Sequence, residues 1–313
     1  MDKTSSVLIT VLGPTASGKT SFAARLAHCI DGEIISADSR QVYRRMDIGT
    51  GKDYSDYIIE GKAIPYHLID IVEPGYKYSL FEYQRDFLNA WNDINGRGKK
   101  AILCGGSGMY IESVLDAYRL VNVPIDEDLR KELEAKTEEE LIDILSSLRK
   151  LHNVSDITSK QRLIRAIEIA VYMSQNKEVH FSFPRFDKLI FGIHSDREKR
   201  RQRITERLGT RLKEGLIEEV QQLLDEGVDP GSLIFYGLEY KYITLYLIGR
   251  MEYEEMKDRL KIAIHQFGKR QMTWFRKMER SGYSIHWLDS DMEMDEKLTR
   301  AIFLIKKRLS ASS

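Results

Sequence analysis

The chain has 313 residues, of which 42% are hydrophobic and 31% are charged, and its formal net charge is zero. This composition suits a folded protein with one large domain or two smaller ones, and it excludes an overall electrostatic pull toward nucleic acid or anionic membranes. No run approaches the roughly 18 apolar residues of a membrane span, and no signal-peptide pattern is present. The isolated Cys29 and Cys104 lack zinc-ligand spacing and favour a reducing compartment. We therefore expect a cytoplasmic protein that does not enter a membrane.

The first predicted elements are a strand, a glycine-containing turn and a helix. Val7–Leu12 is a run of β-branched and aliphatic residues, typical of a buried strand, and the alanine-rich segment Ser21–Ile30 predicts a helix. A phosphate-binding loop of the pattern G-x-x-x-x-G-K-T fits between them in the context that it requires. Its residues are Gly13, Pro14, Thr15, Ala16, Ser17, Gly18, Lys19 and Thr20.

The chemistry of this loop predicts a nucleotide or diphosphate site of the kind found in ATP-binding proteins. Backbone N–H groups and the N-terminus of the following helix attract phosphate, and glycine permits backbone conformations that a Cβ would forbid. Lys19 adds a full positive charge, and the hydroxyl of Thr20 suits Mg²⁺. The loop alone does not identify the phosphorylated ligand.

Three further strands are expected, at Glu33–Ala37, His67–Ile71 and Ala101–Cys104. A helix with Ser79 at its N-terminus is expected over Ser79–Ile94. Strands that alternate with helices predict a parallel sheet, so the fold class is α/β, with a P-loop NTPase-like parallel sheet flanked by helices.

Two segments fall at the sheet edge that carries the phosphate loop, because ligands of parallel sheets bind at the carboxyl ends of the strands. Asp38 follows the second strand, and it either holds Mg²⁺, accepts a proton from a nucleophile, or caps a helix. The glycine-rich segment Gly105–Tyr110 follows Cys104, and it either lets a ligand approach closely or forms a tight turn.

The sequence lacks the acidic strand end that hydrolytic P-loop proteins normally have. A P-loop NTPase normally has an apolar strand that ends in an acidic residue, which organises Mg²⁺ and the attacking water. Here the strand Ala101–Leu103 continues into Cys104 and glycines, and Asp70 lies in the middle of its expected strand. The sequence therefore predicts a site that holds phosphates without hydrolysing them.

The middle of the chain differs in character. Residues 124–160 are helical in pattern and contain ten Asp or Glu against six Lys or Arg. Helical periodicity continues to Gln175, so we expect an inserted helical subdomain over residues 124–185, with a core formed by 1–123 and 186–313. The core resumes with a strand at Lys188–Ile193.

Two basic helices follow in the last third of the chain, before a strand at Ile285–Leu288 and a helix at Glu293–Leu309. Arg197–Lys213 holds eight Lys or Arg against two Glu, and these cations repel one another unless diphosphate, RNA or the acidic insert lies nearby. The second helix, Glu252–Arg276, ends in the segment Lys269–Arg276, whose Trp274 either stacks on RNA or packs in the core.

Several motifs occur in one order along nearly the whole chain. They are GPTASGKT at 13–20, DSRQVY at 38–43 with IGT at 48–50, HLIDI at 67–71, GGSGMY at 105–110, QRLIRAIE at 161–168 and KRQMTW at 269–274, together with Arg203, Ile204 and Arg207. This set resembles the tRNA dimethylallyltransferase family. The resemblance implies transfer of a dimethylallyl group from dimethylallyl diphosphate to the exocyclic amine of the adenosine next to the anticodon, with release of diphosphate.

The resemblance also implies roles for individual residues. The loop Gly13–Thr20 would bind diphosphate, Thr20 would hold Mg²⁺, and Asp38, Arg207 and Thr15 would be catalytic, with Asp38 accepting the amine proton. The partner would be the anticodon stem-loop of tRNA, clamped by the insert, and the protein would be a monomer. The residues expected to contact the tRNA are Asp38, Ser39, Arg40, Gln41, Ser107, Gln161, Arg162, Leu163, Ile164 and Arg165.

The sequence departs from the family pattern at three places. His152–Asp156 replaces an Asp-Pro motif, Gly49–Lys52 reads GTGK where GTAK is more frequent, and Tyr236–Glu239 stands where Gly-Tyr followed by a cation is common. Because Glu239 would repel phosphate, we expect Lys241 to carry the local RNA contact, with Tyr240 and Tyr242 beside it as surfaces on which bases stack.

Three other functions remain open from the residues. The first is prenyl transfer to free adenine nucleotides, the second is a small-molecule P-loop kinase, and the third is a nucleotide-gated RNA-binding module. The insert and the segment that begins at Lys269 favour polymeric RNA, and the missing acidic strand end argues against the kinase.

Overall fold

The computed structural model describes residues 7–148, 159–176 and 183–311. The divergent segment His152–Asp156 lies outside these ranges. The chain divides into two compact units, of which the first joins Met1–Tyr118 to Pro184–Ser313 and the second is Arg119–Phe183. Within the described ranges, none of the helices combines the length and the apolarity of a membrane-spanning segment.

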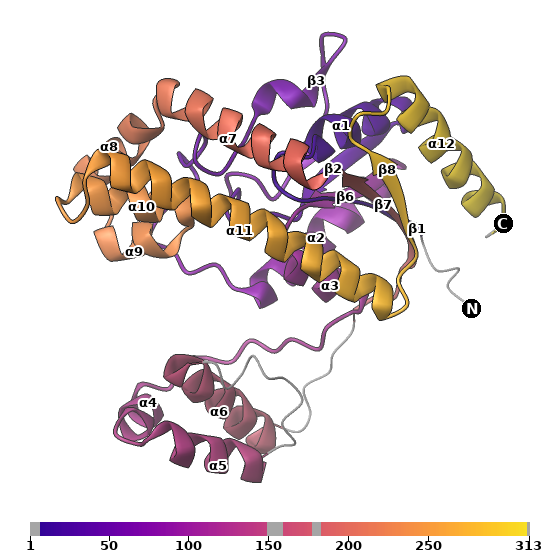
Figure 1. Ribbon diagram of the computed structural model, residues 1–313. Coiled ribbons are helices and arrows are strands. Elements are labelled where there is room, and N and C mark those ends of the chain that lie inside the picture. Colours follow the sequence, from indigo (N-terminus) through magenta and orange to yellow (C-terminus); the bar gives the residue numbers. More distant parts are fainter. Residues whose placement is uncertain (1–6, 149–158, 177–182, 312–313) are drawn as a thin grey trace. The chain divides into compact units, whose positions relative to one another are not determined.

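The first unit contains a six-stranded sheet in which every pairing is parallel, as expected (Figure 1). The strand order is β5-β2-β6-β1-β7-β8. The strands are β1 (Val7–Leu12), β2 (Gly32–Ser36), β5 (Tyr66–His67), β6 (Lys100–Gly105), β7 (Asp187–His194) and β8 (Ile285–Asp289). Leu12 is paired with both Gly105 and Gly192, so β1 and β6 end at the same level, whereas β7 continues to His194.

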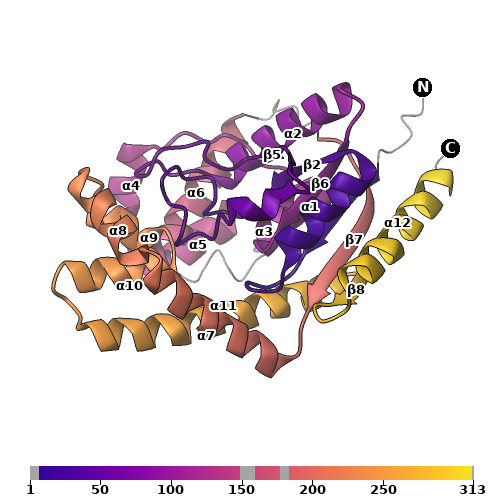
Figure 2. The ribbon, with the colours of Figure 1, turned by 90° about the horizontal axis from the view of Figure 1, so that it is seen from above.

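Helices cover both faces of this sheet (Figure 2). On one face, α1 (Lys19–Ile30) and α12 (Met294–Ala311) pack on a core that includes Ile9, Phe22 and Phe191. On the other lie α2 (Leu80–Gly96) and α3 (Gly108–Leu115). The expected cap of α2 is confirmed, because Ser79 and Glu82 form a reciprocal capping box. A short 3₁₀ helix, η1 (Tyr54–Tyr57), and the hairpin β3 (Ile58–Ile59) and β4 (Lys62–Ala63) complete this half of the unit.

Five helices between β7 and β8 form a second hydrophobic cluster with Val42, Tyr43 and Met46, which belong to the segment after β2. These helices are α7 (Arg197–Lys213), α8 (Leu216–Asp225), α9 (Pro230–Phe235), α10 (Leu238–Leu247) and α11 (Tyr253–Arg280). Both expected basic helices are present, and α11 extends one turn beyond its predicted end. The cluster brings α7, α10 and α11 to the carboxyl edge of β2.

The predicted strand at His67–Ile71 is wrong beyond its first residue. β5 ends at His67, and Leu68 and Asp70 have φ angles of 62° and 56°, which a strand does not allow. Asp70 instead pairs with the buried ammonium of Lys52 and accepts the hydroxyl of Tyr54 at 2.5 Å. Asp70 is therefore a structural carboxylate in a turn rather than a residue inside a strand.

The second unit consists of α4 (Glu127–Glu134), α5 (Glu138–Leu148) and α6 (Lys160–Gln175), with a small core of its own. Glu168, whose side chain is buried, accepts hydrogen bonds from Arg130 at 2.7 and 2.9 Å and from Arg165 at 3.0 Å. These charge-assisted bonds tie α4 to α6.

Candidate active site

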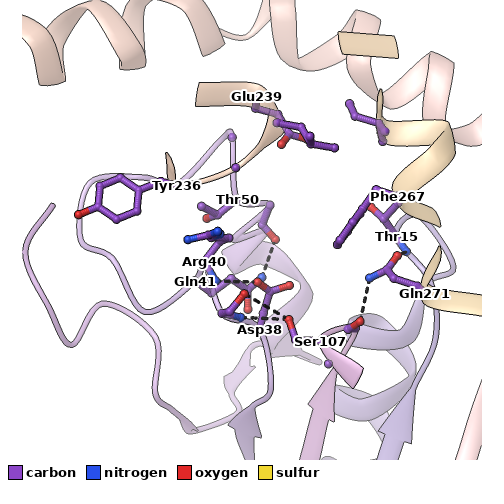
Figure 3. A pocket seen from close by; sticks show the side chains of 18 of the residues that line it. Thr15, Asp38, Arg40, Gln41, Thr50, Ser107, Tyr236, Glu239, Phe267 and Gln271 are labelled. Atoms are coloured by element: carbon purple, nitrogen blue, oxygen red, sulfur yellow. Dashed lines mark hydrogen bonds between the residues drawn. The ribbon is translucent and has the colours of Figure 1, made fainter. Parts of the chain in front are cut away.

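A cavity of about 670 Å³ lies at the carboxyl ends of β1, β2 and β6 (Figure 3). The loops that follow these strands form one wall, and residues of α7, α10 and α11 form the other. The structure brings nine of the predicted site residues together in its lining. They are Thr15, Lys19, Thr20, Asp38, Ser39, Arg40, Gln41, Ser107 and Arg207.

The loop Gly13–Thr20 has the backbone that a phosphate site needs. Gly18 has a φ of 79°, and a Cβ on Gly13 would lie 2.7 Å from the carbonyl oxygen of Ile193. The helix α1 begins at Lys19, so its first N–H groups point into the loop. Ser17 is 3% exposed, and its hydroxyl has no hydrogen-bond partner among the described residues.

Lys19 extends back over this loop, where its ammonium lies 3.4 Å from the carbonyl oxygen of Pro14. Burial lowers the pKa of Lys19, and the nearby carboxylates of Asp38 and Asp53 oppose that effect. A bound phosphate would act in the same direction as those carboxylates and favour the charged ammonium.

Asp38 follows β2 and caps no helix, because the chain continues into turns. Its Oδ1 accepts the backbone N–H of Arg40 at 2.9 Å, which fixes the carboxylate, and Oδ2 has no hydrogen-bond partner among the described residues. The helix-cap interpretation is therefore wrong. The carboxylate is oriented at the cavity wall by this bond, with one oxygen available to a ligand.

Arg207 projects from α7 and donates a hydrogen bond to the hydroxyl of Thr15 in the phosphate loop. Burial and the neighbouring Arg211 lower the pKa of Arg207 to about 10, so its guanidinium remains charged at neutral pH. Arg211, one turn later, lies 3.3 Å from Asp53 and contributes a second cation to the cavity.

Gln271 on α11 connects two loops of the cavity. Its Oε1 accepts the backbone N–H of Thr15 at 2.8 Å, and its Nε2 donates to the carbonyl oxygen of Gly106 at 2.9 Å. The side chain is 7% exposed, so these bonds are protected from water. We expected the segment that begins at Lys269 to contact RNA. Its residue Gln271 instead fixes the distance between the phosphate loop and the loop after β6.

The glycines at the end of β6 and in the loop that follows are explained first by packing between protein segments. A Cβ on Gly105 would lie 2.2 Å from the carbonyl oxygen of Ala37, and one on Gly108 would lie 2.3 Å from the ring of Trp274. Trp274 is half-buried against Gly108, and the ammonium of Lys277 lies 4.8 Å from its ring centre. Its neighbour Phe275 is fully buried and supplies the core contact.

The polar residues after β2 differ in whether their side chains remain available to a ligand. Gln41 is satisfied within the protein, because it donates to the carbonyl oxygen of Gly51 at 3.0 Å and accepts the hydroxyl of Ser36 at 2.9 Å. The guanidinium of Arg40 lies 5.3 Å from the ring of Phe235, which is 64% exposed. Arg40 and Phe235 therefore present a cation and an aromatic face at the cavity. The remaining pair is Ser39 and Ser107, joined by a 3.2 Å bond from the Ser39 N–H.

The other five residues expected to contact tRNA lie in the second unit, on α6. Gln161 and Arg162 are exposed. The side chains of Leu163 and Ile164 are 0% and 5% exposed in the core of this unit, so they are not available to a ligand. Arg165 donates to Glu168 and to the carbonyl oxygen of Val123.

The sequence contains no indication of three cavity residues, Asp53, Phe235 and Phe267, and it indicates Arg211, Glu239 and Gln271 only as parts of a basic helix or a motif. Burial raises the pKa of Glu239, with Arg211 and Arg207 opposing the rise. Our expectation for Tyr240 is wrong, because this ring is 1% exposed and donates its hydroxyl to Glu219 at 2.6 Å. Lys241 lines the cavity, 5.5 Å from the ring centre of Tyr242.

The chain matches the family described as IPP transferase over residues 41–278. The chain belongs to the IPP transferase family. Among relatives, it is 57% identical to tRNA dimethylallyltransferase 1 of Parabacteroides distasonis, over 96% of this chain and 98% of that protein. It is 58% identical to tRNA dimethylallyltransferase 2 of Bacteroides fragilis strain ATCC 25285, over 93% and 95% of the two chains.

Solved structures of the IPP transferase family agree with this fold. The full-length tRNA isopentenylpyrophosphate transferase of Bacillus halodurans superposes with a TM-score of 0.71 at 33% identity, covering 98% of this chain and 97% of that one. The corresponding enzyme of Staphylococcus epidermidis gives 0.70 at 34% identity, covering 97% and 99%. The predicted P-loop NTPase-like α/β fold and family resemblance are confirmed.

Proposed function

We propose that this protein transfers a dimethylallyl group from dimethylallyl diphosphate to the exocyclic amine of the adenosine next to the anticodon of a tRNA. The observation that carries the proposal is the meeting of a phosphate loop, a fixed carboxylate and a buried arginine in one cavity. Relatives more than half identical to this chain bear the name of this activity.

The phosphate loop and two cations suit the leaving group. Lys19 and Arg207 would bind the diphosphate oxygens, and their charge would stabilise the negative charge that grows as the carbon–oxygen bond breaks. Arg207 already donates to Thr15, so a diphosphate in the loop would lie beside the guanidinium.

Magnesium fits this site with few protein ligands. Mg²⁺ commonly uses one or two protein groups together with phosphate oxygens and water, and Thr20 with the carboxylates of Asp38 and Asp53 lines the cavity. Thr20 would hold the ion. When bound, it would neutralise charge on the diphosphate.

Asp38 would act as the general base. The amine nitrogen forms a bond to the first carbon of the dimethylallyl group, the carbon–oxygen bond breaks with its electron pair leaving on diphosphate, and the amine proton passes to Asp38. The free Oδ2 and the bond from Arg40 N–H support this role, since the carboxylate is both positioned and available.

The rim of the cavity suits unpaired RNA bases. The target adenosine would have to leave the base stack to reach Asp38, and exposed aromatic rings with adjacent cations are surfaces on which unstacked bases bind. Phe235 beside Arg40 and Phe267 beside Arg270 provide two such surfaces, with ring-to-cation distances of 5.3 and 6.0 Å.

We further propose that α6 of the second unit contacts the anticodon stem-loop and that the protein acts as a cytoplasmic monomer.

The proposal is tested by supplying labelled dimethylallyl diphosphate with tRNA or with AMP, and in a third arm by supplying ATP without dimethylallyl diphosphate. We expect label in tRNA alone and one diphosphate released per group transferred. Label in AMP would assign the protein to free-nucleotide prenyl transfer, and ATP turnover without prenyl transfer would assign it to a kinase.

A further inference from the structure

A second cavity, of about 750 Å³, lies between α7 and α11 beside the residues that follow β7. The helix α11 separates it from the active-site cavity. Phe267, Gln271 and Trp274 line the active-site cavity, whereas Lys269 and Arg276 line the second one. We refer to this second cavity as the α7–α11 cleft.

Basic side chains dominate the α7–α11 cleft. Its cations are Arg197, Arg200, Arg201, Lys269 and Arg276. Its two carboxylates already have partners, because Asp196 caps α7 through the Glu198 N–H at 2.8 Å and Glu279 accepts the Trp287 indole N–H at 2.8 Å. Among the described residues, none of the five cations forms an ion pair with a carboxylate.

Other cations of the same helix do have carboxylate partners. On the same helix, Lys199 and Arg203 both pair with Asp291, at 2.5 and 2.6 Å, and Arg211 pairs with Asp53. Burial and the nearby Arg276 lower the pKa of Arg200. Cations that gather without anionic partners favour the binding of an anion, since each otherwise repels the others.

Ser195 provides an independent indication of a ligand. It is 5% exposed and lines the α7–α11 cleft directly before the cap of α7. Its hydroxyl has no hydrogen-bond partner in the described parts of the chain. An unpaired buried hydroxyl costs about 1–3 kcal/mol, and a ligand with acceptor oxygens would remove that cost.

We propose that the α7–α11 cleft is a second phosphate-binding site, separate from the loop Gly13–Thr20, and that it holds a backbone phosphate of the RNA substrate. Phosphate offers only acceptors, which match the guanidinium groups and the Ser195 hydroxyl. RNA is favoured over a free anion because successive residues of α11 serve both cavities, with Lys269 at the cleft and Arg270 at the active site. This inference rests on the proposed function.

The test compares the salt dependence of tRNA binding in the parent, in the double variant Arg197→Ala/Arg201→Ala, and in Lys306→Ala/Lys307→Ala. The last pair removes two exposed cations from α12, which does not line the cleft. Each phosphate contact contributes about 0.7–0.9 to the slope of log affinity against log salt. The arginine variant should lose about 0.7–0.9 of slope, the value for one phosphate, and bind tRNA about tenfold more weakly at low salt, whereas the lysine variant should match the parent.

A single substitution adds a readout that a structural role would not give. Ser195→Ala removes an unpaired hydroxyl, so it should leave the free energy of unfolding unchanged or slightly raised while weakening tRNA binding by about two- to tenfold. A loss of stability with unchanged tRNA affinity would contradict a ligand role for this hydroxyl.

Two outcomes overturn the inference. The first is an equal slope in the arginine and lysine variants. The second comes from titrating inorganic diphosphate into Lys19→Ala, with and without the two arginine substitutions. Diphosphate binding that needs both arginines, together with an unchanged tRNA slope, assigns the cleft to a free anion. Neither outcome changes the transfer of label to tRNA by the parent. The proposal about the cleft can therefore fail while the proposed function stands, and the two failures are distinguishable.

Discussion

The side chain of Gln271 accepts a hydrogen bond from the backbone N–H of Thr15, 2.8 Å away, although 256 residues separate them in the chain. Its amide nitrogen also donates to Gly106, so one glutamine sets the distance between the phosphate loop and the loop after β6. Both loops line the cavity in which we place the chemistry.

Replacing this glutamine should therefore affect catalysis through the position of Thr15. We expect Gln271→Ala to lower kcat/KM by about 10–100-fold and stability by about 1–3 kcal/mol, because two buried backbone groups lose their partner. Gln271→Glu keeps an acceptor for Thr15 but cannot donate to Gly106 when ionised. Steady-state kinetics and urea unfolding of both variants measure the effect, and parent-like kinetics for Gln271→Ala would contradict it.

The GTGK departure has a physical reason in this structure. Gly51 has a φ of 71°, and a Cβ there would lie 2.6 Å from a guanidinium nitrogen of Arg211. We expect Gly51→Ala to displace Arg211 from Asp53 and to lower kcat/KM, in addition to a backbone cost of about 1–3 kcal/mol.

Gly61→Ala is the matched control for this substitution. Gly61 has a φ of 74°, and nothing lies within 4 Å of its Cβ position. Both variants carry the same backbone strain, so unfolding should show similar losses, and only Gly51→Ala should lose activity. Equal activities in the two variants would mean that the approach of Arg211 has no catalytic consequence.

Glu239 should make stability depend on pH in a defined direction. Burial raises its pKa above the ordinary value of 4.5, so the folded state binds the proton more tightly than the unfolded state. The stability that Glu239 contributes is therefore fully present below pH 4.5, and it is lost as the pH rises through the raised pKa. Each tenfold difference in proton affinity between the folded and unfolded states corresponds to about 1.4 kcal/mol of stability.

Glu239→Gln removes this titration. The stability of the variant relative to the parent should therefore increase with pH and level off above the raised pKa. Urea unfolding of both proteins between pH 4 and pH 8, about the range over which most carboxyl-linked changes occur, measures the difference. A constant difference, or one that decreases with rising pH, would show that the carboxyl is not held in its neutral form.

Much of the site followed from local sequence. The loop Gly13–Thr20 is specified by its own glycines and by the strand and helix around it, and Asp38 could be assigned to the same edge because parallel strands end together. The bounds of α7 followed from its charge pattern, and Arg207 and Arg211 both belong to that predicted run of cations.

The remaining site residues depend on contacts between distant segments. Gln271 acquires its role only when α11 packs beside the loops after β1 and β6, and its motif alone suggested RNA. Glu239 and Asp53 reach the cavity through the packing of α10 and of the segment before η1. Asp70 was assigned to a strand because its neighbours are apolar, whereas its pairing with Lys52, 18 residues away, places it in a turn.

The account depends most directly on Asp38 as the group that accepts the amine proton. Asp38→Asn keeps the shape and the bond from the Arg40 N–H while removing the base, and Asp53→Asn is the control, since it removes a carboxylate from the same cavity. The decisive measurement is the single-turnover rate of dimethylallyl transfer with both substrates saturating. We predict that Asp38→Asn binds both substrates and reacts about 10²–10⁴-fold more slowly, with a smaller loss in Asp53→Asn. A rate for Asp38→Asn within about threefold of the parent, far short of that general-base contribution, would contradict the account.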